Sequence, residues 1–170
     1  MGKKSTKKDK NIYQICRENL ELTREAASEL LESISDSRIE KIESGKSLPH
    51  PDEVLIMADK YKMPNLRNQF CSHDCPIGRT YIPEITMKDL SQITLEILAS
   101  LNSVEKNKDR LIEIVADGTI SDSELDDFAH IQNELEHISV AVESLQLWVE
   151  KTIHENGINK EKLEEIRKKL

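Results

Sequence analysis

Three side chains capable of metal or redox chemistry lie close together near the middle of the sequence: Cys71, His73 and Cys75. Thiolate sulfur and imidazole nitrogen are ligands that zinc prefers, and either His50 or Cys16 is available as a fourth ligand. The two thiols alone form a redox pair if their geometry allows a bridge. However, Cys-x-His-x-Cys is not a standard zinc-finger spacing. We therefore favour two reduced thiols, with Cys71 partly buried, and expect no metal.

A second pattern, Asp117-Gly-Thr-Ile120 followed by Glu124, copies the second half of a calcium-binding loop. The first and third ligand positions of that loop fall on Glu113 and Val115, and a valine side chain has no oxygen for calcium. A helix stop followed by a capping box of Ser121 and Glu124 explains the same residues. We expect the capping box and no calcium site.

Signatures of common catalytic sites are absent from the sequence. It contains no glycine-rich phosphate loop and no nucleophile elbow, and no pair of carboxylates stands apart from the acidic surface. We therefore expect that the protein is not an enzyme and that it needs no cofactor.

The composition is typical of a helical chain with a thin core. Of 170 residues, 33% are charged and only 4% are aromatic, which disfavours a β-sandwich or a β-barrel. No apolar run approaches the ~18–20 residues of a membrane span. No apolar segment follows the basic N-terminus, and three cysteines are too few for a disulfide scaffold. These features predict a cytoplasmic protein with no membrane partner.

Charge divides the chain into two parts. Residues 1–70 have 13 basic and 12 acidic side chains, whereas residues 71–170 have 11 and 20. The net charge of −8 gives the whole chain a field that repels nucleic acid, so any contact with nucleic acid must be local. We expect two modules with different functions.

Helical periodicity dominates both modules, which predicts an all-α fold. In the first module, start and stop signals such as Thr23, Ser35, Gly45 and Pro51 separate five short helices. The helices are expected at residues 11–20, 23–31, 35–44, 51–61 and 64–70. A segment that begins near Cys75 and ends at Pro83 has two prolines, one glycine and no helical pattern, which is typical of a linker.

In the second module the apolar residues recur every seven positions. The repeats are Leu90, Ile97, Val104 and Leu111, then Phe128, Leu135, Val142 and Val149, and beside these Ile131, Ile138, Leu145 and Thr152. They predict a coiled-coil-like hairpin whose second helix has roughly 30 residues, or about 45 Å. A short helix over residues 159–169 completes the chain. The predicted domains are a flexible basic tail at 1–10, a helical domain at 11–72, a linker at 73–85 and the hairpin module at 86–170.

The first module resembles the Xre/Cro-type helix-turn-helix family, which has the lambda-repressor-like fold, over roughly residues 11–70. The residues that carry the resemblance are Leu22-Thr-Arg-Glu25, Ser35, Ile39-Glu-Lys-Ile-Glu-Ser-Gly-Lys46, Pro49 and Val54-Leu-Ile-Met-Ala58. The whole chain, including Cys71-Ser-His-Asp-Cys-Pro-Ile-Gly78, is similar to a group of bacterial helix-turn-helix proteins of the same length. The resemblance implies a transcriptional regulator that binds double-stranded DNA, with residues 35–44 as the recognition helix.

The resemblance also implies a set of DNA-binding residues: Arg24, Ser35, Asp36, Ser37, Arg38, Lys41 and Lys46. With Ile39 and Ile42 in the core, Arg38 and Lys41 are expected to contact bases or phosphates. Arg24 and Lys46 are expected to contact phosphates, together with the five lysines before residue 11. In the family an arginine of the first helix pairs with a glutamate of the recognition helix. Arg17 and Glu43 occupy those positions, so we expect a structural ion pair between them.

Three features depart from the family pattern. The turn Leu31-Glu-Ser-Ile34 has no glycine and one extra residue, and Ser28 stands where alanine is usual. Asp36 and Glu40 place negative charge on the recognition helix, where it opposes contact with phosphates. The acidic residues favour an alternative function, in which the protein is an interaction scaffold whose helix-turn-helix no longer reads DNA.

The apolar stripe of the second module is broader than a single hairpin needs. We expect a homodimer that pairs two hairpins in a four-helix bundle and presents two helix-turn-helix units to a symmetric site. The alternatives are that the hairpin binds another protein or packs onto the first module.

Overall fold

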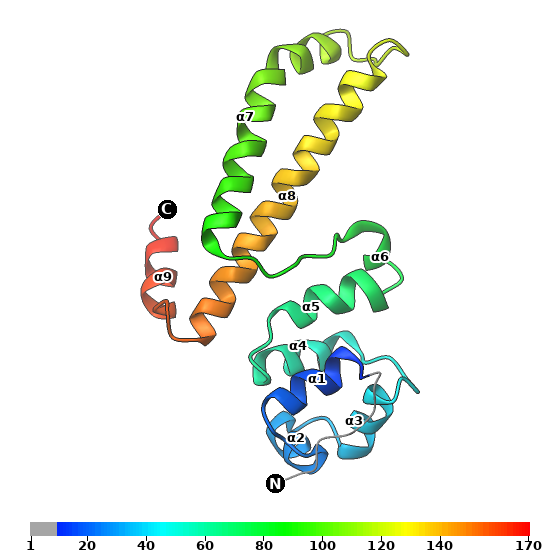
Figure 1. Cartoon of the computed structure of the whole chain (residues 1–170), viewed down its shortest axis with the longest axis vertical. Helices are drawn as coiled ribbons and strands as arrows, with labels where there is room; N and C mark the ends of the chain where they lie inside the picture. Colours follow the sequence, from blue (N-terminus) through cyan, green and yellow to red (C-terminus); the bar gives the residue numbers. More distant parts are fainter. Residues whose placement is uncertain (1–9) are drawn as a thin grey trace. The chain divides into compact units, whose positions relative to one another are not determined.

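The computed structural model describes residues 10–170, and this part of the chain is built from helices without a β-strand (Figure 1). The expected all-α fold is therefore confirmed. The described residues form two units, one made of the chain up to Glu84 together with Lys151–Leu170, and one made of Ile85–Glu150. The predicted basic tail lies outside the described residues, except for Lys10. Within residues 10–170, no helix is long and apolar enough to cross a membrane.

All five helices that we expected in the first module are present. They are α1 (Ile12–Asn19), α2 (Arg24–Leu31), α3 (Asp36–Glu43), α4 (Pro51–Lys60) and α5 (Asn65–Gln69). The first three begin at polar N-caps, because the side chains of Asn11, Thr23 and Ser35 accept hydrogen bonds from the backbone amides of Gln14, Ala26 and Arg38. Gly45 follows α3 with φ of +73°, a conformation that glycine adopts without steric cost.

The helices of the first module bury one stripe each in a common core. Its buried members are Tyr13, Cys16, Ala27, Leu31, Ile34, Ile39, Ile42, Val54, Met57, Ala58, Tyr61, Leu66 and Phe70. Ile39 and Ile42 are both 1% exposed, which fixes the rotation of α3 about its axis. The opposite side of α3 consequently faces solvent.

The segment predicted to be a linker without helical structure contains helical turns. The chain continues from α5 through a π-helical turn, η1 (Phe70–Asp74), and then forms the single-turn helix α6 (Gly78–Tyr81). Gly78 lies against the backbone of η1, where an added Cβ would be 2.0 Å from the carbonyl oxygen of Cys71. The sequence pattern missed these turns because their positions depend on this close approach rather than on an apolar repeat.

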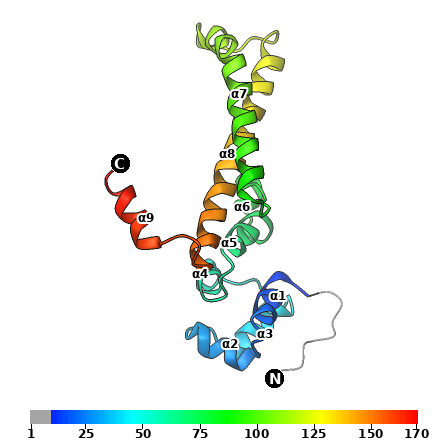
Figure 2. The ribbon, with the colours of Figure 1, turned by 60° about the vertical axis from the view of Figure 1, so that its left-hand side comes forward.

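The second module contains the two long helices that we expected, α7 (Leu90–Val115) and α8 (Leu125–His154), which lie side by side in both views (Figures 1 and 2). The short helix α9 (Lys160–Arg167) follows, with Asn159 as its N-cap. Asn156, with φ of +60°, ends α8 in the left-handed conformation that asparagine tolerates.

The predicted capping box before α8 is only half formed. The Glu124 carboxylate accepts hydrogen bonds from both the backbone amide and the hydroxyl of Ser121, at 2.9 and 2.6 Å. The serine hydroxyl therefore donates to the carboxylate, and the Glu124 amide donates instead to the Ser121 carbonyl. The helix itself begins one residue later, at Leu125.

The apolar seam between the long helices was predicted only in part. The residues of α7 that turn away from solvent include a line that alternates by four and three: Ile93, Ile97, Ser100, Val104, Asn107, Leu111 and Ile114. Glu96, Ser103 and Arg110, each one position before a member of this line, are also half-buried. Leu101 and Val115, which lie beside this line, are about half exposed. In α8 the buried line is also displaced by one residue from the predicted one. Glu134 and Ala141 turn away from solvent, whereas the predicted seam residues Leu135 and Val142 are exposed. Polar or small residues occupy several seam positions. A prediction from hydrophobicity alone therefore places the seam partly on the more apolar residues next to it.

Candidate nucleic-acid interface

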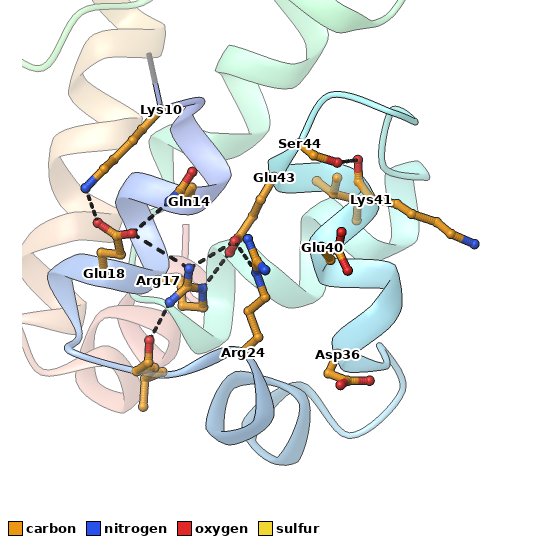
Figure 3. A network of polar contacts seen from close by, with 12 residues as sticks. Lys10, Gln14, Arg17, Glu18, Arg24, Asp36, Glu40, Lys41, Glu43 and Ser44 are labelled. Carbon is orange, nitrogen blue, oxygen red and sulfur yellow. Dashed lines mark hydrogen bonds and ion pairs between the residues drawn. The ribbon is translucent and has the colours of Figure 1, made fainter. Parts of the chain in front are cut away.

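Arg17 of α1 and Glu43 of α3 form the expected ion pair, in which two hydrogen bonds join guanidinium and carboxylate (Figure 3). The distances are 2.5 Å from Nε to Oε1 and 2.9 Å from Nη2 to Oε2. Both residues are buried, and the remaining guanidinium nitrogen, Nη1, donates to the Leu22 carbonyl. Arg17 thus ties α1 to α3 and to the chain that enters α2.

Arg24, at the start of α2, shares the same carboxylate. Its Nε donates to Oε2 of Glu43 at 2.9 Å, while its side chain is 40% exposed. Glu43 therefore neutralises two guanidinium groups, one buried and one at the surface. The structure places Arg24 beside α3, where its solvent-facing nitrogens are accessible to a phosphate.

Further contacts hold the two ends of α1. The Asn11 side chain caps the helix and also donates to the Ile42 carbonyl at 2.7 Å, which fixes α1 against the end of α3. Glu18 accepts from Lys10 at 2.6 Å and from Gln14 at 2.8 Å, and these bonds hold the pKa of its carboxyl below the ordinary value. Through Asn11 and Arg17, α1 thus contributes polar contacts that support α3.

The long turn between α2 and α3 has a backbone geometry that explains two departures from the family pattern. Glu32 has φ of +59° and ψ of −49°, and the Ser33 amide donates to the Leu31 carbonyl across it at 2.6 Å. This is a γ-turn with positive φ, which is rare and strained for a residue with a side chain. The Ser28 hydroxyl donates to the Ile34 carbonyl at 2.9 Å, so serine at that position bonds the extra length of turn.

The solvent-facing side of α3 is more acidic than basic. Asp36, Ser37, Glu40 and Lys41 are all exposed there, and Figure 3 shows Lys41 pointing away from the Arg17–Glu43 pair. The hydroxyl of Ser35 caps the helix and lies 3.2 Å from that of Ser37. Ser37 and Lys41, which were predicted to bind DNA, therefore share this side of α3 with the carboxylates of Asp36 and Glu40.

Lys46 and Lys41 differ in their surroundings. The ammonium of Lys46, just beyond α3, lies 3.4 Å from the Glu40 carboxylate, and both side chains are at least half exposed. A surface pair of this kind contributes little stability and can separate in favour of another anion. Lys41 is exposed at the C-terminal end of α3, a position that suits a cation near the helix carbonyls.

The hydrogen bonds that the structure shows for Arg38, which was expected to bind DNA, all lie within the protein. Its Nε and Nη2 both donate to the Glu53 carboxylate at 2.7 Å, Nη1 donates to the Ser47 hydroxyl, and Nη2 also reaches the Leu48 carbonyl. All three guanidinium nitrogens are engaged within the protein. Arg38 therefore joins α3 to the start of α4 and is a structural residue.

Glu53 was not among the predicted site residues, although it bonds both to Arg38 of α3 and to the backbone at the start of α4. It accepts both hydrogen bonds from Arg38 and one from the backbone amide of His50 at 2.7 Å, which caps α4. The hydrogen bonds from Arg38 are the main cause of a pKa below the ordinary value for this carboxyl. The signal in the sequence was an acidic third position in a helix that begins with proline.

The cysteine and histidine candidates do not gather into a metal site. Among residues 10–170, no group of three His, Cys, Asp or Glu side chains is arranged to bind a metal ion. Cys71 and Cys75 are half-buried against the core, and the Cys75 sulfur accepts a hydrogen bond from the Gly78 amide at 3.4 Å. His73 is exposed, with Nδ1 3.0 Å from the Gln69 amide nitrogen.

The third cysteine is chemically distinct from the other two. Cys16 of α1 is 1% exposed, and burial raises the pKa of its thiol to about 11. A thiol with such a pKa is almost fully protonated at neutral pH, so Cys16 is neither a ready metal ligand nor a nucleophile.

Comparison with known proteins identifies the first module. Residues 14–70 match the family model of a helix-turn-helix domain, so this part of the chain is a helix-turn-helix domain. A comparison with curated proteins gives no significant match, and neither does one with solved structures.

Proposed function

We propose that the protein is a cytoplasmic transcriptional regulator of the Xre type that binds double-stranded DNA with α3 in the major groove. The main support is the Arg17–Glu43–Arg24 network, which holds α3 at a fixed rotation with Ser37 and Lys41 toward solvent. Rigid positioning of a short helix is what base readout in the major groove requires.

Different side chains of α3 contact different groups of the DNA. Lys41 contacts a base edge or a phosphate, and Ser37 forms a hydrogen bond with either. Asp36 and Glu40 accept hydrogen bonds from cytosine amino groups, which are the donors that the major groove offers to carboxylates. An operator rich in cytosine on the contacted strand is therefore the expected target.

Phosphate contacts come from the periphery of the domain. Arg24 and Lys46 lie beside α3 with exposed nitrogens, and the lysines at the start of the chain add further positive charge. Arg24, Lys41 and Lys46 of one protomer together contribute about −3 to the slope of log K against log salt. Each lysine at the start of the chain that also contacts a phosphate makes this slope steeper by about 1.

Selection from genomic DNA fragments tests the proposal. The full chain is expected to enrich a small set of fragments with a shared cytosine-containing motif at low salt. A matched control is Lys106→Ala, which removes an exposed lysine of α7 and is expected to leave the selection unchanged. The absence of measurable affinity for any fragment at low salt would overturn the proposal.

A second candidate function has its own observation. Because Arg38 bonds within the protein and the exposed side of α3 bears Asp36 and Glu40, that side can instead bind a basic protein surface. In that case the helix-turn-helix serves as an interaction scaffold. Loss of DNA binding in the selection experiment favours this alternative.

A further inference from the structure

The long hairpin has an exposed apolar stripe beside its seam. On α7 each member of this stripe lies one residue beyond a seam position, and the members are Leu98, Leu101, Glu105, Lys108, Ile112 and Val115. Its four apolar side chains are about half exposed or more. Their spacing of three and four residues places all six members on one side of the helix.

The helix α8 carries a matching pair, Leu135 and Val142, which follow the seam positions Glu134 and Ala141 and are more than 40% exposed. In an antiparallel pair the two helices run in opposite directions and their seams face in opposite directions. These two reversals cancel, so the residue that follows a seam position lies on the same side of the pair in both helices. The two stripes therefore form one surface, which we call the apolar face. It comprises Leu98, Leu101, Glu105, Lys108, Ile112 and Val115 of α7 with Leu135 and Val142 of α8.

The other side of the hairpin differs in character. The positions that precede the seam include Lys106 and Arg110 on α7 and His130 and His137 on α8. Arg110 also bridges the two helices, with its Nε 2.7 Å from the Asp127 carboxylate. Apolar residues thus concentrate on one side of the hairpin, which is the arrangement expected when that side has a partner.

The order of residues along α7 identifies the partner. The stripe on α7 has two apolar residues at each end and two charged residues of opposite sign, Glu105 and Lys108, at its centre. Two copies of α7 in antiparallel orientation bring Leu98 opposite the partner's Val115, Leu101 opposite the partner's Ile112 and Glu105 opposite the partner's Lys108. A parallel orientation brings like charges together, which is unfavourable.

We infer that the apolar face binds a second copy of this chain, with the two α7 helices antiparallel about a two-fold axis between Glu105 and Lys108. The Arg110–Asp127 bridge sets α8 alongside α7, so the same axis also brings the two α8 helices antiparallel to each other. In the monomer Glu105 and Lys108 pair with each other at 2.6 Å, and both are at least half exposed. In the dimer Glu105 of one chain pairs instead with the partner's Lys108, and Lys108 pairs with the partner's Glu105. The contact is isologous and closes as a four-helix bundle.

Sedimentation equilibrium on the full chain tests the inference. The expected mass is twice the 19.5 kDa of the chain at tens of micromolar. Glu105→Lys and Lys108→Glu each create two like-charge contacts across the axis and are expected to raise the dissociation constant ~10-fold or more. Lys106→Glu makes the same charge change on the polar side and is expected to leave the dissociation constant unchanged. Circular dichroism verifies that each variant remains helical.

Mixing the two charge variants provides the decisive arm. In a heterodimer of Glu105→Lys with Lys108→Glu, both charge contacts are again between opposite charges, so the mixture is expected to associate as tightly as the wild type. A wild-type chain of 19.5 kDa at tens of micromolar would overturn the inference, as would a dimer that neither charge variant weakens. A mixture that stays as weak as its separate components would also overturn it. None of these outcomes depends on DNA.

Discussion

Arg38 of α3 and Glu53 of α4 join these two helices through two hydrogen bonds of 2.7 Å between guanidinium and carboxylate. The family resemblance places Arg38 on the DNA-facing side, yet its third nitrogen bonds to Ser47 as well. The consequence is that the only positively charged side chain of α3 that remains without a bond to a carboxylate in the described residues is Lys41. Arg38 thus stabilises the fold, and the proposed DNA contact of α3 falls to Lys41.

The carboxylate of Glu43 is the main polar support of the first module. Glu43→Gln keeps the shape of the side chain but leaves Arg17 without its buried counter-charge, so we expect unfolding to become easier by about 3–5 kcal/mol. Urea unfolding monitored by circular dichroism gives this value. Glu40→Gln, on the exposed side of the same helix, is the control and is expected to change stability by less than about 0.5 kcal/mol.

The Arg38–Glu53 pair makes stability depend on pH in the acidic range. Folding lowers the pKa of Glu53 below its ordinary value of 4.5, so the pair contributes stability above that pH and loses it as pH falls through the folded pKa. Glu53→Gln is expected to destabilise the protein at neutral pH by about 1–3 kcal/mol. The difference between variant and wild type should shrink as pH drops well below 4.5. A difference that stays constant from neutral to acidic pH would contradict this account.

Glu32 has a positive φ in the turn between α2 and α3, where a side chain is unfavourable. Glu32→Gly is expected to stabilise the domain by about 1 kcal/mol, because the relief of backbone strain exceeds the added freedom of the unfolded chain. Glu32→Ala separates this cause from removal of the charge, since alanine retains a Cβ and is expected to give no such gain. Thermal unfolding of the two variants under the same conditions distinguishes them.

Gly78 lies so close to η1 that it excludes any side chain. An added Cβ would be 2.0 Å from the Cys71 carbonyl oxygen, which is backbone and cannot move independently of its turn. Gly78→Ala is therefore expected to cost about 1–3 kcal/mol and to displace α6. Arg79→Ala, at the exposed neighbouring position, is expected to be close to neutral. Equal stability of the two variants would mean that η1 and α6 do not pack as described.

The short helices were predictable from the sequence because local signals define them. Thr23 and Ser35 cap their helices as expected, and Gly45 ends α3 with positive φ. The Arg17–Glu43 pair was also predictable, through the family resemblance. In each case either residues within a few positions of one another or a known motif contain the necessary information.

The features that the sequence did not predict have a different origin, because they concern contacts between residues far apart in sequence. The bond of Arg38 to Glu53, fifteen residues away, is one such contact. In the long helices, Ser100 and Asn107 occupy seam positions that a hydrophobic repeat does not recognise, whereas the more apolar Leu101 is exposed. The seam follows the rotation of the helix, and the surplus apolar residues beside it form the apolar face.

The central claim is that Lys41 and the exposed side of α3 contact DNA. It is tested most directly by measuring the affinity of the full chain for a selected genomic fragment over a series of salt concentrations, for the wild type, Lys41→Ala and Lys106→Ala. The account predicts that Lys41→Ala binds about 10-fold more weakly and that Lys106→Ala binds like the wild type. Equal affinity of Lys41→Ala and the wild type would contradict it, and so would the absence of any salt-dependent binding by the wild type.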